Sequence, residues 1–188
     1  QWVSRQGIST ATARCYATES ERAYAPAAAW LRALPLPHLD PVWLSEIARI
    51  LPDLLAERPD LPPPGPLTEA WERRRFFEAL ARAVLGTDRP LLLLIDALQW
   101  CSRGTIEWLQ YLLRFDPQAP LLVIGTYRSE EVGNGHPLTV LLHQLRQDEQ
   151  LTEIDLPPLT RAETATLASN VARRDLGPDL VNCLSSQA

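Results

Sequence analysis

The chain has 188 residues, enough for one domain of ordinary size, and 46 % of them are apolar, which is sufficient to build a core. A charged fraction of 22 % and a net charge of −5 exclude a disordered acidic tail and a basic nucleic-acid binder. Lys and Met are both absent. Without Lys these residues hold no Schiff-base lysine and no G-x-x-x-x-G-K-[ST] phosphate loop, and without an initiator Met we expect a piece of a longer polypeptide.

The first third of the chain predicts one strand and two helices. Gly7–Tyr16 alternates small and β-branched residues, a pattern typical of a strand. Apolar residues at helical spacing predict helices over Tyr24–Leu34 and Pro41–Leu55, and we expect these to pack as a hairpin within residues 24–58. Pro59–Pro66 has five prolines in eight residues and is expected to be a stiff connector.

The middle of the chain predicts a strand–helix–strand unit. A long amphipathic helix over Leu67–Leu85 precedes the continuous apolar run Leu91–Ile95, which is typical of a strand buried on both faces. Helical spacing over Thr105–Phe115 separates this run from a second such strand, Leu121–Tyr127. Two buried strands joined by a helix predict a right-handed parallel crossover.

The last third continues the alternation of helices and strands. We expect a helix over His136–Arg146, a strand over Leu151–Leu156, and a helix over Thr160–Arg173 that opens with a Thr-x-x-Glu capping box. The fold class predicted from this order is α/β, a mostly parallel sheet flanked by helices. Residues 1–176 would form this core, and residues 177–188 would start a following helical segment.

The apolar runs bear on the location of the protein, and the cysteines bear on disulfide bonds and zinc binding. The longest apolar runs have four or five residues, far short of the roughly 18–20 that cross a bilayer, so we expect no membrane contact and a cytoplasmic location. Cys15, Cys101 and Cys183 include no C-x-x-C pair. They are therefore expected to be thiols, with no disulfide framework and no zinc site.

Polar side chains follow two of the predicted buried strands. Asp96 comes directly after the first, and Thr126 and Arg128 come at the end of the second. In an open parallel sheet the ligand lies beyond the carboxyl ends of the strands. An acid there is suited to hold Mg²⁺ on a nucleotide, and an arginine is suited to bind a γ-phosphate. An Asp at a strand end also often only caps the next turn.

Three segments together resemble one family: PLLLLIDALQW at Pro90–Trp100, PLLVIGTYRSEEV at Pro120–Val132 and LPPLTRAET at Leu156–Thr164. They are similar to the AAA-type ATPase domain, of the signal-transduction (STAND) class, found in large bacterial transcriptional regulators. The resemblance implies a P-loop NTPase-like fold with ATP and Mg²⁺ as ligands. It also implies that Asp96 binds the magnesium, that Arg128 senses the γ-phosphate, and that Thr126 helps to place Arg128.

The chain departs from that family in two ways. Ala97 stands where the family commonly has a second acid that orients the attacking water. The phosphate loop is missing, together with the first strand and most of the helix behind it. We therefore expect this chain alone to bind ATP weakly or not at all and to be inactive as an ATPase.

Two functions from different classes remain open at this point. The first is a regulatory ATP-binding switch that works with other domains of the same polypeptide, with possible self-association and no direct contact with nucleic acid. The second is a non-catalytic interaction or scaffold domain that keeps the NTPase fold. An unrelated hydrolase or metalloenzyme has little support, because His38, His136 and His143 lie in no catalytic or zinc-binding motif.

Overall fold

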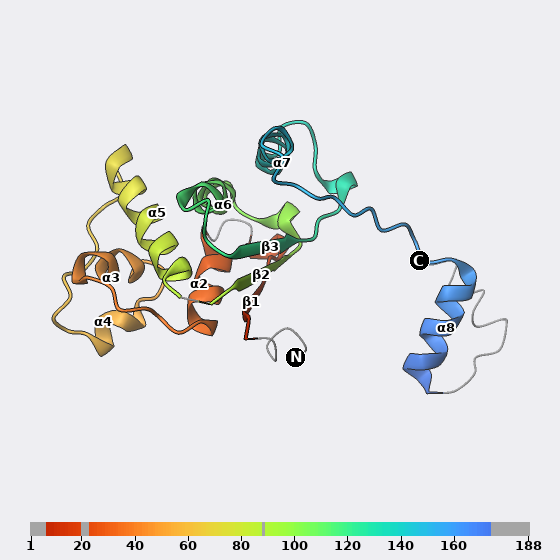
Figure 1. Ribbon diagram of the computed structural model, residues 1–188, viewed down its shortest axis with the longest axis horizontal. Helices are drawn as coiled ribbons and strands as arrows, with labels where there is room; N and C mark the ends of the chain where they lie inside the picture. The colour runs from red at the N-terminus through yellow and green to blue at the C-terminus, as the bar shows by residue number, and fades with distance from the viewer. Residues whose placement is uncertain (1–6, 20–22, 88, 174–188) are drawn as a thin grey trace. The chain divides into compact units, whose positions relative to one another are not determined.

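A computed structural model of the chain describes residues 7–19, 23–87 and 89–173 (Figure 1). The chain divides into two compact units, with the division between Gln150 and Leu151. This division falls earlier than the boundary near residue 176 that the sequence predicts. The expected helical start at 177–188 lies outside the described residues.

A three-stranded parallel sheet is the centre of the first unit. Its strands are β1 (Ser9–Arg14), β2 (Leu91–Asp96) and β3 (Leu121–Gly125), in the order β1-β2-β3. The register pairs Arg14 with Asp96 and Ile95 with Gly125, so all three strands end at the same edge. These strands confirm three of the predicted strands and the parallel crossover. The fold is α/β, with helices beside a parallel sheet.

The fourth predicted strand, Leu151–Leu156, is wrong. No strand is assigned there, and the described sheet ends at β3. Ile154 and Leu156 are 80 % and 82 % exposed. Alternation predicts a strand only where a neighbouring strand supplies the backbone partners, and the described residues supply none for this segment.

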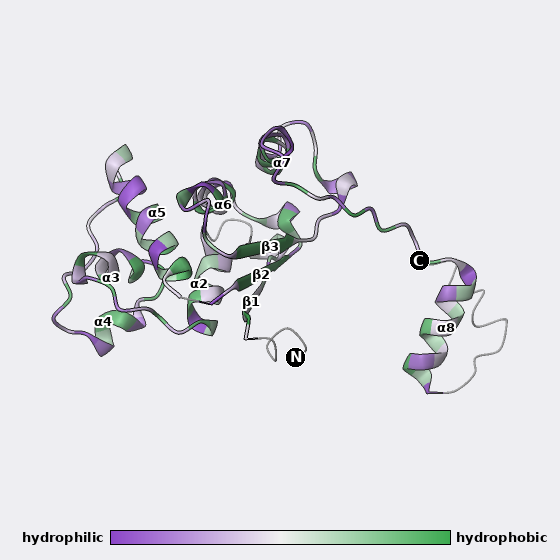
Figure 2. Cartoon of the chain, in the orientation of Figure 1, coloured by the Kyte–Doolittle hydropathy of each residue, from purple (hydrophilic) through white to green (hydrophobic). Residues whose placement is uncertain are grey.

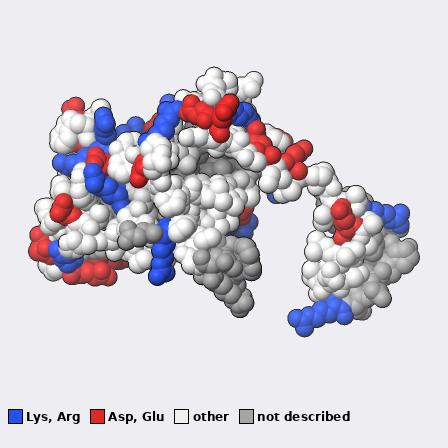
Figure 3. All heavy atoms as spheres, viewed as in Figure 1, with Lys and Arg blue, Asp and Glu red and all other residues white. Residues whose placement is uncertain are grey.

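The two faces of the sheet differ in burial. One face is the more buried, and in β1 and β2 it carries fully buried small and aliphatic side chains, namely Ala11, Ala13, Leu91, Leu93 and Ile95. Leu121 and Val123 of β3 are half-buried on this face. On the opposite face Leu122 and Ile124 of β3 are 59 % and 44 % exposed. Figure 2 shows β2 and β3 as strongly hydrophobic, and Figure 3 shows a largely uncharged surface over them. Side chains alternate between the two faces along a strand, so Asp96 lies on the same face as Leu92 and Leu94. This is the more open face of the sheet.

Seven α-helices and three short 3₁₀ turns complete the described part of the chain. The α-helices are α2 (Ala25–Ala33), α3 (Pro41–Ile47), α4 (Asp53–Glu57), α5 (Ala70–Leu85), α6 (Arg103–Phe115), α7 (Pro137–Gln147) and α8 (Arg161–Ala172). The 3₁₀ turns are η1 (Ala17–Glu19), η2 (Leu98–Trp100) and η3 (Ser129–Glu131). Among the described helices, none is long and apolar enough to cross a membrane.

The helix predicted over Pro41–Leu55 is broken in two, with α3 and α4 separated by a turn at residues 48–52. Pro52 explains the break, because it has no N–H to donate and its ring clashes with the preceding helical turn. The main neighbour of α2 is β1, whereas that of α3 is α5. The two helices therefore do not form the closely packed hairpin that the sequence predicts.

Two tryptophans join the helices to the sheet and to each other. Trp30 of α2 and Trp108 of α6 are fully buried, with ring centroids 6.1 Å apart. Trp30 Nε1 donates to the carbonyl of Leu94 in β2 at 3.2 Å, and Trp108 Nε1 donates to the carbonyl of Phe77 in α5 at 3.3 Å. Each indole thus buries a large apolar surface and still satisfies its N–H.

The second unit contains α8, whose start confirms the predicted capping box. Thr160 Oγ1 accepts from the N–H of Glu163 at 3.3 Å, and the Glu163 carboxylate accepts from the N–H of Thr160 at 2.8 Å. These two bonds satisfy two of the N–H groups that a helix start leaves unpaired. The Thr160 hydroxyl also donates to the Glu163 carboxylate at 2.7 Å, and this bond, with the one from the Thr160 N–H, lowers the pKa of Glu163 below its usual value.

The difference between the two sheet faces yields a stability prediction. Leu93→Ala removes a fully buried side chain from the central strand and is expected to cost about 2–5 kcal/mol of unfolding free energy. Leu122→Ala is the matched control, because Leu122 is 59 % exposed and should cost well under about 1 kcal/mol. Urea denaturation followed by circular dichroism measures both. Equal losses would contradict the assignment of the two faces.

Candidate functional site

Asp96 is the last residue of the central strand, and two neighbours hold its carboxylate. Thr126, the residue after β3, donates its hydroxyl to Asp96 Oδ1 at 2.6 Å. Arg14, the last residue of β1, places Nε 3.2 Å from Asp96 Oδ2. The side chains of Asp96 and Arg14 are 49 % and 61 % exposed, so a molecule in solution can reach this pair.

Thr126 ties the end of β2 to the end of β3 through its backbone and its side chain. Its N–H donates to the carbonyl of Ile95 at 3.0 Å, and its own carbonyl accepts from the N–H of Leu98 at 2.8 Å. Its hydroxyl accepts from the N–H of Ala97 at 3.0 Å while it donates to Asp96. A hydroxyl is suited to this position because it is both a donor and an acceptor.

The turn after Asp96 has a strained backbone. Ala97 has φ 64° and ψ 56°, the left-handed region, which costs a residue with a Cβ about 1–2 kcal/mol. The bonds from Ala97 and Leu98 to Thr126 hold this conformation. Gly125 leaves space for the turn, because a Cβ at that position would collide with Leu98 Cδ1. The position of Asp96 therefore depends on residues of two strands.

Arg128 lies at the same edge of the sheet, three residues beyond the end of β3. Asp96 and Arg128 therefore come at the carboxyl ends of neighbouring parallel strands. The structure pairs Arg128 with Glu131, at 3.3 Å, and pairs Asp96 with Arg14. The side chain of Arg128 is 67 % exposed. The two residues are thus on one edge, and each has its own ion-pair partner.

A second set of contacts joins the η2 turn to the loop before α7. Gln99 Nε2 lies 3.4 Å from a carboxylate oxygen of Glu131, and His136 Nε2 lies 2.9 Å from the carbonyl of Gln99. His136 Nδ1 accepts from the N–H of Leu138, which leaves Nε2 to carry the proton and donate. Gln99 Oε1 is buried without a partner among the described groups. A water or a ligand with an N–H or O–H would satisfy it.

The contacts of His136 and His143 are with the α7 helix and the turns beside it. His136 caps the start of α7, and His143 contacts Gln147 on the same helix at 3.1 Å. Within the described residues no group of three or more His, Cys, Asp or Glu side chains is arranged to hold a metal ion. Asp96 therefore stands as a single carboxylate with hydroxyl and guanidinium neighbours.

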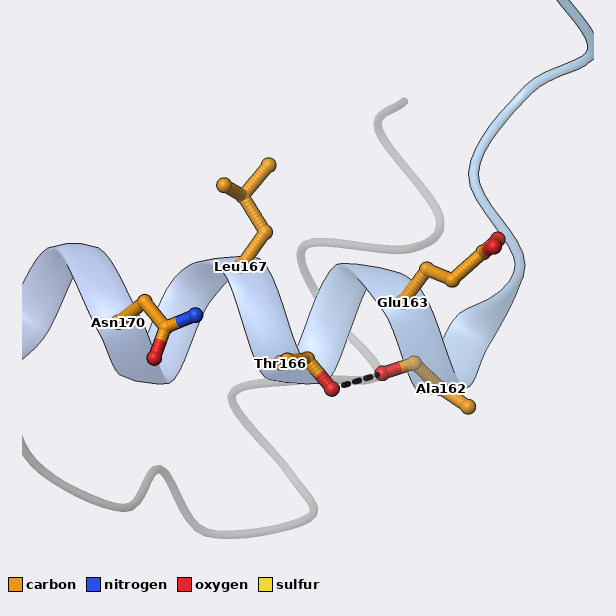
Figure 4. Close-up of a pocket in the computed structure, with 5 residues that line it drawn as sticks. All are labelled: Ala162, Glu163, Thr166, Leu167 and Asn170. Carbon is orange, nitrogen blue, oxygen red and sulfur yellow. Dashed lines mark hydrogen bonds between the residues drawn. The ribbon is translucent and has the colours of Figure 1, made fainter.

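The described surface includes a hollow on α8 and a crevice beside Arg14. The described residues that line the hollow on α8 all belong to that helix (Figure 4). At this hollow Thr166 Oγ1 donates to the carbonyl of Ala162 at 2.9 Å, so its proton is used within the helix. The other is a narrow crevice beside Arg14 that reaches Cys15 and Cys101. Of these two, the crevice adjoins the residues of the candidate site.

Arg14 is the site residue that the sequence analysis missed. The available signal was a charged residue at the end of a segment predicted as a strand, which a parallel sheet brings to the same edge as Asp96. Its contact with Asp96 depends on the strand order β1-β2, which local patterns do not specify.

Comparison with known proteins assigns no family to the chain. No family model, curated protein or solved structure gives a significant match. The likeness to signal-transduction ATPases therefore rests on the residue motifs alone.

The role of the Thr126 hydroxyl can be tested by substitution. Thr126→Val has nearly the same shape but leaves the Ala97 N–H and one Asp96 oxygen without this partner, so we expect a loss of about 1–3 kcal/mol in unfolding free energy. Thr126→Ser keeps the hydroxyl and is the matched control, with an expected loss below about 1 kcal/mol. Urea denaturation gives both values. The assigned role fails if the Val variant is as stable as the Ser variant.

Proposed function

We propose that this chain is part of an ATP-binding regulatory module of a multidomain bacterial transcriptional regulator or signalling protein. The observation that supports this most is the Asp96 carboxylate, fixed by Thr126 at the carboxyl edge of a parallel sheet. Arg14 and Arg128 bring positive charge to the same edge from the two neighbouring strands. A nucleotide triphosphate with its magnesium ion has the charges that such an edge would bind.

The chemistry of the residues fits a magnesium ion at Asp96. Mg²⁺ prefers oxygen ligands, keeps several waters, and is usually bound through one or two carboxylates and the substrate's phosphates. Asp96 is half exposed, and each of its oxygens keeps a lone pair beyond those used by Thr126 and Arg14. When bound, Mg²⁺ would offset phosphate charge and polarise the γ-phosphoryl group. Asp96 would be its protein ligand, with Thr126 as the residue that orients it.

The arginines would bind and orient the phosphates. Arg128 has an exposed side chain whose ion-pair partner among the described residues is the exposed Glu131, so it can turn to an incoming γ-phosphate at little cost. Arg14 neutralises Asp96 in the nucleotide-free state and would be released to a phosphate oxygen when a cation takes its place. Loop amides and a loop lysine supply most phosphate affinity in such proteins, so the proposal includes a phosphate loop encoded before Gln1.

Slow ATP hydrolysis would suit a module that switches between two conformations. Ala97 cannot take a proton from the attacking water, and its N–H is committed to Thr126. Binding would therefore bias the protein between two arrangements, and hydrolysis would reset it slowly.

A non-catalytic interaction domain is the second candidate, and two observations favour it. Asp96 already has a cationic partner in Arg14, and Leu122 and Ile124 leave apolar surface exposed on the sheet. The coding sequence upstream of Gln1 discriminates between the two candidates. A G-x-x-x-x-G-K-[ST] motif there would support the ATP-binding module, and its absence would leave the interaction domain.

The metal role of Asp96 can be tested in the longer protein that carries such a loop. Asp96→Ala is expected to weaken magnesium-dependent ATP binding by at least about 10–100-fold, a loss typical even of residues that only support a metal ligand. Asp60→Ala is the matched control, since Asp60 is also an exposed acid paired with an arginine, Arg58, but lies in the connector before α5. Isothermal titration calorimetry with and without Mg²⁺ measures the change. Unchanged metal dependence in the Asp96 variant would remove the assignment.

The role of Ala97 can be tested in the same protein. Asp and Asn adopt the left-handed backbone of this position more readily than Ala does, so both substitutions suit the turn. Ala97→Asp is expected to leave ATP affinity roughly unchanged and to raise the hydrolysis rate by up to about 10²–10⁴-fold, because it supplies a general base. Ala97→Asn controls for shape without a base and should give no gain. A phosphate-release assay that finds equal rates for the two variants would mean that the missing acid does not limit turnover.

A further inference from the structure

Two cysteines far apart in the sequence meet beside the candidate site. Cys15 and Cys101 are 86 positions apart, yet their Sγ atoms lie 2.7 Å from each other. Both residues are 7 % exposed. Such a contact is closer than ordinary packing of two thiols, and it places each sulfur within reach of a bond to the other.

Backbone bonds fix both cysteines in this position. The N–H of Cys15 donates to the carbonyl of Asp96 at 2.9 Å, which extends the β1–β2 pairing by one residue. The N–H of Cys101 donates to the carbonyl of Leu98 at 3.0 Å and closes the η2 turn. Ser102 then caps α6, with its Oγ accepting from the N–H of Thr105 at 3.2 Å. The sulfur contact is therefore held from two separate elements.

The surroundings of the pair determine its chemistry. The neighbouring Cys15 thiol and burial both raise the pKa of Cys101, so the Cys101 thiol stays protonated at neutral pH, and the two sulfurs share an S–H···S contact. The crevice lined by Arg14, Tyr16, Ser102 and the two cysteines gives a small molecule a way in. A bulky thiol reagent has no such path, whereas hydrogen peroxide is hardly larger than water. We therefore expect the two cysteines to react slowly with hydrogen peroxide and to exclude bulky thiol reagents.

We propose that Cys15 and Cys101 form a redox-active pair that hydrogen peroxide converts to an intramolecular disulfide. One sulfur, as it loses its proton, attacks a peroxide oxygen, which breaks the O–O bond and gives a sulfenic acid and water. The second sulfur attacks the sulfenic sulfur, forms the S–S bond and releases a second water. The two thiols are oxidised by two electrons and one peroxide is reduced to two waters. A dithiol reductant reverses the change by exchange.

The disulfide would lock the edge of the sheet. It would join the residue after Arg14 to the turn that follows Asp96, and so hold the ends of β1 and β2 together covalently. A bond across 86 positions strongly restricts the unfolded chain. Oxidation is therefore expected to stabilise the fold and to fix the Arg14–Asp96 pair. This inference stands apart from the proposed nucleotide function.

The purified wild-type chain provides the direct test. It is treated with hydrogen peroxide, blocked with N-ethylmaleimide, digested and analysed by mass spectrometry without reduction. We expect the Cys15 and Cys101 peptides to be joined and two hydrogens lighter than their sum, with Cys183 alkylated as the internal control. Sulfinic or sulfonic acid on either cysteine, or a disulfide that includes Cys183, would overturn the proposal.

Thermal unfolding gives an independent readout. Oxidised wild type is expected to melt about 5–15 °C above the reduced form, and dithiothreitol should remove the gain. Cys15→Ala and Cys101→Ala should each lose the gain, whereas Cys183→Ala should keep it. If a buried variant fails to fold, the wild-type peptide map still decides. A linked peptide pair without any rise in melting temperature would contradict the proposed locking of the edge.

Discussion

The hydroxyl of Thr126 is the contact on which the candidate site depends. It donates to the Asp96 carboxylate and accepts from the Ala97 N–H, so it fixes a charged side chain and a strained turn together. Its backbone bonds to Ile95 and Leu98 add two further links between the ends of β2 and β3. These bonds, together with the one from the Trp100 N–H to the Ala97 carbonyl at 3.0 Å, hold Ala97 in the left-handed region. The same edge carries both the proposed metal ligand and the proposed redox pair.

The sequence predicted those elements whose pattern is set locally. β2 and β3 follow from continuous apolar runs, and α5 and α6 follow from long, clear helical spacing. The capping box of α8 was also predicted, because it depends on residues three positions apart. Asp96 and Arg128 were placed at one edge because parallel strands end together.

The errors arose where a distant partner or a single residue decides the structure. Leu151–Leu156 alternates like a strand, yet it has no described neighbour to pair with. The apolar spacing around Pro52 predicts one continuous helix, but Pro52 has no N–H to donate and interrupts it. The contacts of Arg14 with Asp96 and of Cys15 with Cys101 follow from the order of strands, which no local pattern contains.

The register of the sheet also has a consequence for how the chain folds. β2 and β3 pair across about thirty positions, with α6 between them, whereas β1 pairs with β2 across roughly eighty positions that include four α-helices. Closing the longer loop costs more chain entropy, and long-range pairs generally form late. We therefore expect the β2–α6–β3 unit to form first and β1 to join last, although β1 is made earlier on the ribosome. Arg14 and Cys15 would then reach their partners only in the final step of folding.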